Sequence, residues 1–258
     1  MRLLLLASAV LVAAVPAVAA SATAPPLIRV AKPSFPAPLA AVAPSGSVRL
    51  TTVSTTSRGP TYTPPRDPLI TGEAVRELGG ATPTRAFPQP GTTLVLYGTG
   101  VVVAYGPRGG MKYAFDVRSF GFPPRALVPR AYGPQEVVWA RQLGKLLVVQ
   151  TSHLGYASDS GDRNGYLTGI DIRSGRVAWR SPSLVANADN FLVARGLIVS
   201  GYGFTAEQDW LYLVDPADGR VRDRLALPSM AERLSLRDGQ IVVRAYDARV
   251  VARLRDVG

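Results

Sequence analysis

The chain of 258 residues contains no cysteine and a single histidine, His153. The absence of cysteine excludes a disulfide framework, thiolate metal sites, cysteine nucleophiles and covalent haem attachment. A hydrolytic or metal site at His153 would need partner residues, and the nearby Ser152, Asp159 and Asp162 are ordinary loop residues, so we expect a surface or loop histidine. The sequence has no Gly-x-Ser-x-Gly, Walker-type or metalloprotease helix motif.

Long hydrophobic runs are missing beyond the first twenty residues, and those residues are typical of a secretory signal peptide. Arg2 precedes an apolar run from Leu3 to Val15, which is too short for an ordinary membrane span but of the length found in signal peptides. Pro16 and several small residues follow, so we predict cleavage near Ala19 or Ala20. We therefore expect a secreted protein, periplasmic or on the cell surface, with an uncleaved anchor as the alternative.

Charged residues make up only 18% of the chain, yet the formal net charge is +11. Lysine occurs only as Lys32, Lys112 and Lys145, and the other basic residues are arginines scattered through expected loops and strand ends. Two explanations stay open: the composition of a GC-rich genome, and attraction to an anionic surface such as phospholipid head groups, wall polymers or acidic polysaccharide. We do not expect nucleic acid as a partner, because an exported protein seldom meets it.

Residues 21–90 are rich in proline, serine, threonine and alanine, and no acidic residue occurs between Ala22 and Arg66. This composition favours a semi-extended, weakly basic segment. It either tethers the following domain to a membrane or wall layer, or wraps around that domain. Within it, Val48–Val53 alternates like a strand that could join a sheet edge, and Glu73–Leu78 could form one or two helical turns.

The rest of the chain contains an internal repeat. Residues 166–177 align with residues 210–221, and a weaker copy covers residues 112–119. Each of the two clear copies has an aromatic-led strand, an aspartate, a tight turn that ends in glycine, and Arg-Val at the start of the next strand. The aspartate and glycine positions are Asp171 with Gly175, and Asp215 with Gly219. The aspartates can accept hydrogen bonds from the turn amides.

A second pattern of strand, glycine turn and strand recurs around Gly100, Gly144, Gly196 and Gly239. Apolar runs such as Leu146–Val149 are continuous, as expected for strands that are covered on both faces. Repeats of four short strands indicate the blades of a propeller. We therefore predict an all-β chain with a short β-propeller or propeller-like array of about four blades over residues 91–258, after a signal peptide (1–20) and a tether (21–90). It is a closed propeller, an open arc, or an array completed by a partner or a second copy.

Residues 169–179 resemble the tryptophan-docking repeat of quinoprotein (PQQ-dehydrogenase-like) β-propellers, with Asp171, Gly175 and Trp179 at the motif positions. The resemblance implies that Trp179 packs against a neighbouring blade. The second copy has Asp223 where the tryptophan should be. Enzymes of this family hold their quinone with calcium, a catalytic aspartate and often a vicinal disulfide. Since cysteine is absent and the other groups cannot be placed, the resemblance is to a short non-catalytic member.

One loop resembles a degenerate calcium-binding loop. Oxygen-bearing side chains stand at positions 1, 3, 5 and 12 of this loop, around a glycine at position 6. They belong to Ser160, Asp162, Asn164 and Asp171. The alternative is a solvated hairpin extension.

Four aromatic residues around the middle repeats, Tyr156, Tyr202, Phe204 and Trp210, could line a rim that stacks on sugar rings or a peptide. The alternative is that they pack between blades.

These patterns predict an exported, non-enzymatic binding or scaffold module of the cell envelope that acts through propeller rim loops. The expected partner is a protein or an envelope polymer, with self-association and peripheral contact with an anionic surface left open. No cofactor is expected, and calcium is the one candidate. The alternative is an exported enzyme, a quinoprotein oxidoreductase or a glycan-active hydrolase or lyase, whose site the sequence does not reveal.

Overall fold

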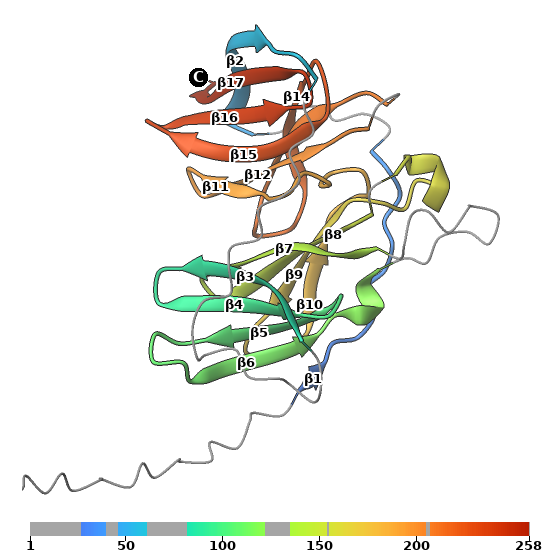
Figure 1. Ribbon diagram of the computed structural model, residues 1–258, viewed down its shortest axis with the longest axis vertical. Helices are drawn as coiled ribbons and strands as arrows, with labels where there is room; N and C mark the ends of the chain where they lie inside the picture. Colours follow the sequence, from blue (N-terminus) through green and yellow to red (C-terminus); the bar gives the residue numbers. More distant parts are fainter. Residues whose placement is uncertain are drawn as a thin grey trace, which may run out of the picture.

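The computed structural model describes residues 27–39, 46–60, 82–121, 135–153, 155–204 and 207–257. The predicted signal peptide and the helical turns predicted at Glu73–Leu78 lie outside these residues. Over the described ranges the chain forms four β-sheets and two short 3-10 helices, η1 (Arg118–Phe120) and η2 (Ala157–Ser160) (Figure 1). None of its described helices is long and apolar enough to cross a membrane. The prediction of an all-β, propeller-like array of about four blades is confirmed.

The sheets follow one another along the chain. The first contains β3 (Pro83–Gln89), β4 (Thr92–Tyr97), β5 (Val101–Tyr105), β6 (Met111–Asp116) and β1 (Ile28–Arg29). The second contains β7 (Glu136–Leu143), β8 (Leu146–Ser152), β9 (Tyr166–Asp171) and β10 (Val177–Arg180). The third contains β11 (Leu192–Ala194), β12 (Leu197–Tyr202), β13 (Trp210–Val214) and β14 (Val221–Ala226). The fourth contains β15 (Ala231–Arg237), β16 (Gln240–Ala245), β17 (Ala248–Asp256) and β2 (Val48–Ser57).

The N-terminal part of the chain supplies the outermost strand at both ends of this array. β1 pairs in parallel with β6 of the first sheet, and β2 pairs antiparallel with β17 of the fourth. Figure 1 shows this segment, in blue, running along one side of the molecule from β1 towards β2. We call its described residues, 27–39 and 46–58, the belt.

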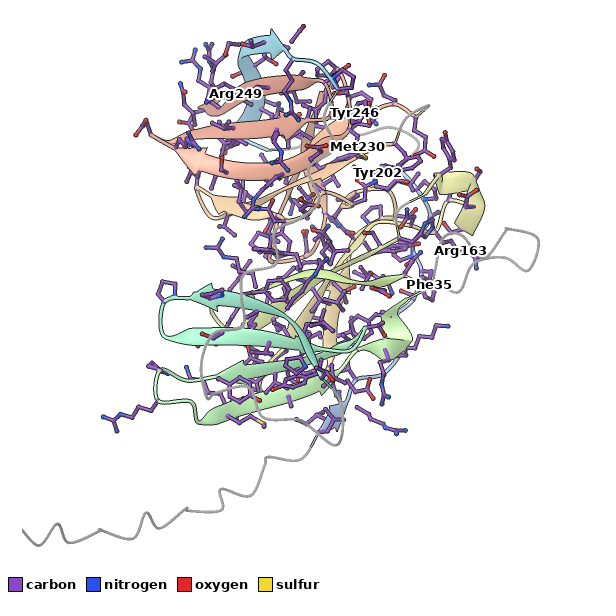
Figure 2. The ribbon with its side chains drawn as sticks, viewed as in Figure 1. Phe35, Arg163, Tyr202, Met230, Tyr246 and Arg249 are labelled. Carbon is purple, nitrogen blue, oxygen red and sulfur yellow. The ribbon has the colours of Figure 1, made fainter. Side chains whose placement is uncertain are left out.

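The belt also contacts the two middle sheets. The centroid of the Phe35 ring, labelled in Figure 2, lies 5.8 Å from that of the Tyr166 ring on the second sheet. The Leu50 amide donates a hydrogen bond of 2.6 Å to Asp223 Oδ2 on the third sheet. Of the two interpretations left open for residues 21–90, these contacts favour the one in which the segment wraps the domain.

The first strand of the first sheet, β3, also comes from within residues 21–90. The turn between β3 and β4 contains Gly91, which has a φ of 71°, so Gly91 rather than Gly100 corresponds to the first hairpin glycine of the later sheets. Pro83 and Pro88 concealed this strand, because proline removes a ladder donor and is confined to edge strands. The strand order places β3 at an edge of its sheet, which is compatible with both prolines.

The core consists of apolar layers between successive sheets. One joins the first and second sheets, another the second and third, and another the third and fourth. Middle strands are buried along almost their whole length, including every residue of β5 and all of β9 except its last. Such strands are covered on both faces, which explains the continuous apolar sequences of β5 and of Leu146–Val149 in β8.

Trp179 on β10 connects the second sheet to the third. Its indole Nε1 donates a hydrogen bond of 2.8 Å to the carbonyl oxygen of Pro216, in the turn that precedes β14. The ring lies between Gly169 and Gly219, and a Cβ placed on either glycine would come within 2.4 Å of an indole carbon. Gly219 also has a φ of 72°, so glycine is required there by conformation as well as by space.

The Trp179→Ala variant is expected to lower the free energy of unfolding by about 3–5 kcal/mol, because it removes a buried indole from the contact between two sheets. The matched control is Trp210→Ala, since Trp210 is only half-buried and its ring is stacked under the guanidinium of Arg224 at 4.0 Å. Urea denaturation of both variants measures the difference. Equal losses would show that Trp179 has no special part in holding the sheets together.

Candidate anion-binding site

The fourth sheet differs from the others because only one of its faces carries apolar side chains throughout. Leu234, Ile241, Val243 and Val250 pack into the layer shared with the third sheet. Residues at the alternate positions point to the opposite face and are exposed or half-buried. This is the alternation typical of an antiparallel sheet with one side in water.

The solvated face carries a row of arginines on three adjacent strands. Arg233 of β15 lies opposite Arg244 of β16, which in turn lies opposite Arg249 of β17. Neighbouring strands are about 4.8 Å apart, so the three side chains start close together. Like charges at opposite positions of a sheet destabilise it. The row therefore opposes folding wherever no negative charge offsets it.

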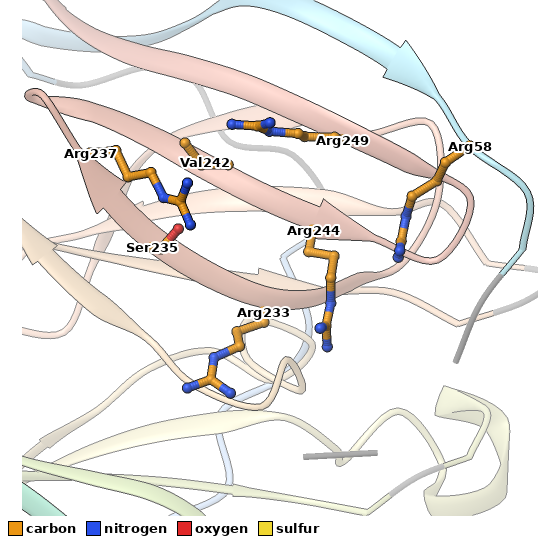
Figure 3. Close-up of a pocket in the computed structure, with 7 residues that line it drawn as sticks. All are labelled: Arg58, Arg233, Ser235, Arg237, Val242, Arg244 and Arg249. Atoms are coloured by element: carbon orange, nitrogen blue, oxygen red, sulfur yellow. The ribbon is translucent and has the colours of Figure 1, made fainter. Parts of the chain in front are cut away.

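A pocket of about 400 Å³ lies over this row. Figure 3 shows that its lining side chains come from β15, β16, β17 and the end of the belt. The lining residues are Arg58, Arg233, Ser235, Arg237, Val242, Arg244 and Arg249. Five of the seven side chains are therefore guanidinium groups.

A buried carboxylate holds two of these arginines in place. Glu232 occupies a β-bulge between Ala231 and Arg233, and its Oε2 lies 3.1 Å from Arg58 Nη2 and 3.0 Å from Arg244 Nε. Its side chain is only 2% exposed. A bulge re-aims the residue that it inserts, which here turns the carboxylate towards the arginines.

The remaining arginines of the pocket are open to a ligand. Arg233, Arg237 and Arg249 are exposed, and none of them makes an ion pair within the described part of the chain. Asp189 lies near Arg233 and Arg244, but burial raises the pKa of its carboxyl, against the opposing effect of these arginines. With five guanidinium groups against the carboxyls of Glu232 and Asp189, the pocket has an excess of positive charge.

The chemistry that this arrangement offers is recognition of anions. Each guanidinium presents a planar fork of donors that fits the oxygens of a phosphate or a carboxylate. Ser235 adds one hydroxyl and Val242 a small apolar surface. These groups can orient and neutralise a ligand, and such charge-assisted hydrogen bonds are stronger than neutral ones.

The four residues of the calcium-like loop are not brought together. Asn164 and His153 are both buried. The Oδ1 atom of Asn164 accepts a hydrogen bond of 3.0 Å from the backbone amide of His153. Asp171 ends β9, and its Oδ1 accepts from the Ser174 amide at 2.8 Å. The length of β9 separates these two side chains by about 17 Å, far beyond the reach of one ion. Ser160 is buried and Asp162 exposed on the same loop. In the described ranges no group of three or more acidic or histidine side chains could hold a metal ion.

The repeat aspartates act inside their own turns. Asp215 Oδ1 accepts a hydrogen bond of 2.8 Å from the Ala217 amide, as Asp171 does from Ser174. The glycines that end both turns have positive φ, 67° at Gly175 and 72° at Gly219. These residues shape the turns between β9 and β10 and between β13 and β14.

The four aromatic residues do not form one exposed rim. Tyr202 is 2% exposed and belongs to the layer between the second and third sheets. Tyr156 and Phe204 pack edge to face with ring centroids 4.8 Å apart. Trp210 is opposite Tyr202 on the neighbouring strand and is stacked under Arg224.

Sequence reasoning missed the arginine row. The local signal was present as arginines four positions apart, at 233 and 237 and at 249 and 253. That signal predicts only which arginines share one face of a single strand. The row appears when the register sets three strands side by side.

The Arg249→Gln variant is expected to raise the free energy of unfolding at low salt by about 0.2–1 kcal/mol, because it relieves repulsion within the row. Glutamine keeps much of the aliphatic stem. The gain is expected to shrink in concentrated salt, which screens the charges. Chemical denaturation at both ionic strengths measures it, with Arg176→Gln on an exposed turn as the matched control. A loss of stability at low salt for Arg249→Gln would contradict the repulsion.

A separate acidic group stands where β13 begins. Asp209 is 9% exposed, and its Oδ1 accepts no hydrogen bond from the described residues. Burial, with smaller contributions from the negative charges of Glu207 and Asp247, raises the pKa of Asp209 to about 7. The folded protein therefore binds a proton that the unfolded chain releases near pH 4.

Because the folded pKa of Asp209 is the higher one, the stability that the protonated form contributes is lost as pH rises from about 4 through about 7. The Asp209→Asn variant is expected to be more stable than the parent above about pH 7 and to flatten this part of the profile. Thermal unfolding across this pH range tests it. Asp238→Asn, at an exposed turn, is the control, and parallel profiles for the parent and Asp209→Asn would refute the assignment.

No protein-family model matches the chain, and no curated protein matches it. Similar solved structures include the computationally designed Ika4 protein, at 16% identity and a TM-score of 0.46, over 73% of this chain and 100% of that one. BamB from Moraxella catarrhalis matches at 9% identity and a TM-score of 0.31, over 66% of this chain and 71% of that one. The quinohemoprotein alcohol dehydrogenase ADHIIG from Pseudomonas putida HK5 matches at 15% identity and a TM-score of 0.39, over 63% of this chain and 28% of that one. Since all three TM-scores are below 0.5, the propeller-like architecture rests on the four sheets themselves.

Proposed function

We propose that this protein is a non-enzymatic binding module of the cell envelope that holds an anionic ligand on the solvated face of its fourth sheet. The observation that carries the proposal is the row formed by Arg233, Arg244 and Arg249. Glu232 pairs only with Arg58 and Arg244, so the exposed Arg233 and Arg249 are left for a partner that supplies the opposite charge.

The geometry of the pocket supports binding. Glu232 restrains Arg58 and Arg244 before a ligand arrives, which lowers the side-chain entropy lost on binding. Arg233 and Arg249 remain exposed at the surface. The pocket thus combines two positioned guanidiniums with others that can adjust to the ligand.

The proposed location in the envelope rests on the signal peptide predicted at residues 1–20. An exported basic protein meets wall polymers, anionic lipids and acidic polysaccharides. An envelope polymer with anionic groups is therefore the proposed partner.

Tripolyphosphate is a suitable first probe, because its phosphates match the guanidinium forks. Calorimetric titration of the mature chain at low salt is expected to detect binding, and the Arg233→Gln/Arg249→Gln double variant is expected to weaken it at least about tenfold. That loss corresponds to about one charge-assisted hydrogen bond.

The control is Arg173→Gln/Arg176→Gln, which removes the same charge from an exposed turn of the second sheet. This variant is expected to bind as the parent does. Equal weakening in both double variants would mean that net charge alone attracts the probe, and absence of binding to the parent would overturn the proposal.

A further inference from the structure

The positive face of the fourth sheet continues well beyond the pocket. Along β17, Arg253 and Arg255 follow Arg249 at alternate positions and therefore point to the same side. The pairing of β17 with β2 shifts register between Val251 and Ala252, and beyond this shift it sets Arg255 opposite Arg49. Arg253 and Arg255 are exposed.

This surface measures about 14 Å across its four strands and about 20 Å from Arg249 to Arg255 along β17. We call it the arginine face. Hydroxyl groups stand between its charges, from Thr51, Ser54 and Thr56 on β2 and from Ser235 on β15. Hydroxyls donate to phosphate oxygens as readily as they accept.

Acidic side chains of the four strands do not offset these charges. Glu232 is buried beneath Arg58 and Arg244. Asp256 at the end of β17 is bound to Arg195 of the third sheet at 2.6 Å. β16 and β2 contain no acidic residue.

A small anion can contact only the arginines around one point, so it would leave the distant ones repelling one another. A chain of linked anionic groups can neutralise the whole face and release its counterions together. A flat bilayer would meet the outer arginines but not those that line the hollow of about 400 Å³. The extent of the face and its hollow thus favour a flexible polymer over both other ligands.

Resting on the proposed function, we infer that the ligand is a linear, phosphate-bearing polymer that enters the pocket at Arg233, Arg244 and Arg249 and runs along β17 to Arg253 and Arg255. Phosphate is the anion that suits the guanidinium fork and the hydroxyls together. The pocket supplies the strongest contacts, and Arg253 and Arg255 add affinity only for chains long enough to reach them.

The test compares tripolyphosphate with polyphosphate chains of about 10 and about 50 phosphates on the mature chain. The long chains are expected to bind at least about tenfold more tightly per chain than tripolyphosphate. Their affinity is also expected to fall more steeply with salt, because more phosphates are neutralised.

The Arg253→Gln/Arg255→Gln variant separates this inference from the proposed function. It is expected to bind tripolyphosphate as the parent does, while it loses most of the gain for long chains and lowers their salt slope by about 1–2. Arg173→Gln/Arg176→Gln is the charge-matched control and is expected to keep both properties.

Each other outcome is decisive. Long chains that bind no more tightly than tripolyphosphate, or a variant that keeps the full gain, would overturn the polymer and leave an anion-binding pocket. Binding to phosphatidylglycerol vesicles without binding to polyphosphate would replace the polymer by a lipid surface. No binding to any of these probes would overturn the proposed function itself.

Discussion

The whole molecule depends on one constraint, which is that each sheet has two faces and apolar faces must be covered. The two middle sheets meet it by stacking on both sides, so β9 of the second sheet is almost entirely buried. An array of sheets that follow one another also has an end. The fourth sheet alternates buried and exposed residues, and its solvated face is where the charged side chains gather. The candidate site lies on the face of this sheet that is left in water.

The belt completes the sheets at both ends and also contributes to the site. β1 and β2 occupy the outermost positions of the first and fourth sheets, and the bond from the Leu50 amide to Asp223 holds β2 against the third sheet. The belt then delivers Arg58 to the pocket. Its sequence has no acidic residue, so its wrapping adds no negative charge beside the arginine face. Folding of the belt and formation of the pocket are therefore linked.

The sequence was sufficient for the architecture because the repeats are local. Continuous apolar runs, the paired Asp171 and Gly175 turn and the hairpin glycines each reflect the structure of a few neighbouring residues. β3 was missed because Pro83 and Pro88 resemble a linker in isolation, although an edge strand accepts them.

The site could not be obtained in the same way, because it depends on register between strands. Arg233, Arg244 and Arg249 are spread along the sequence and become neighbours only through pairing across β15, β16 and β17. The prediction of a calcium-like loop had the opposite difficulty. Its residues are close in sequence, but Asn164 and Asp171 are separated by a strand and already bound to backbone amides.

The arginine row ties ligand binding to the stability of the fold. In the free protein, the repulsion between like charges at opposite positions lowers the free energy of unfolding. Glu232 compensates Arg58 and Arg244 from beneath, but Arg249 and Arg233 lie beyond its ion pairs. An anion on the face removes this repulsion as well as adding its own contacts, so it stabilises the folded state by both. Salt weakens binding through both parts at once: it screens the attraction of the ligand, and it relieves in advance the repulsion that the ligand would have relieved. The affinity of such a face should therefore depend on ionic strength more steeply than the number of contacted arginines alone would give.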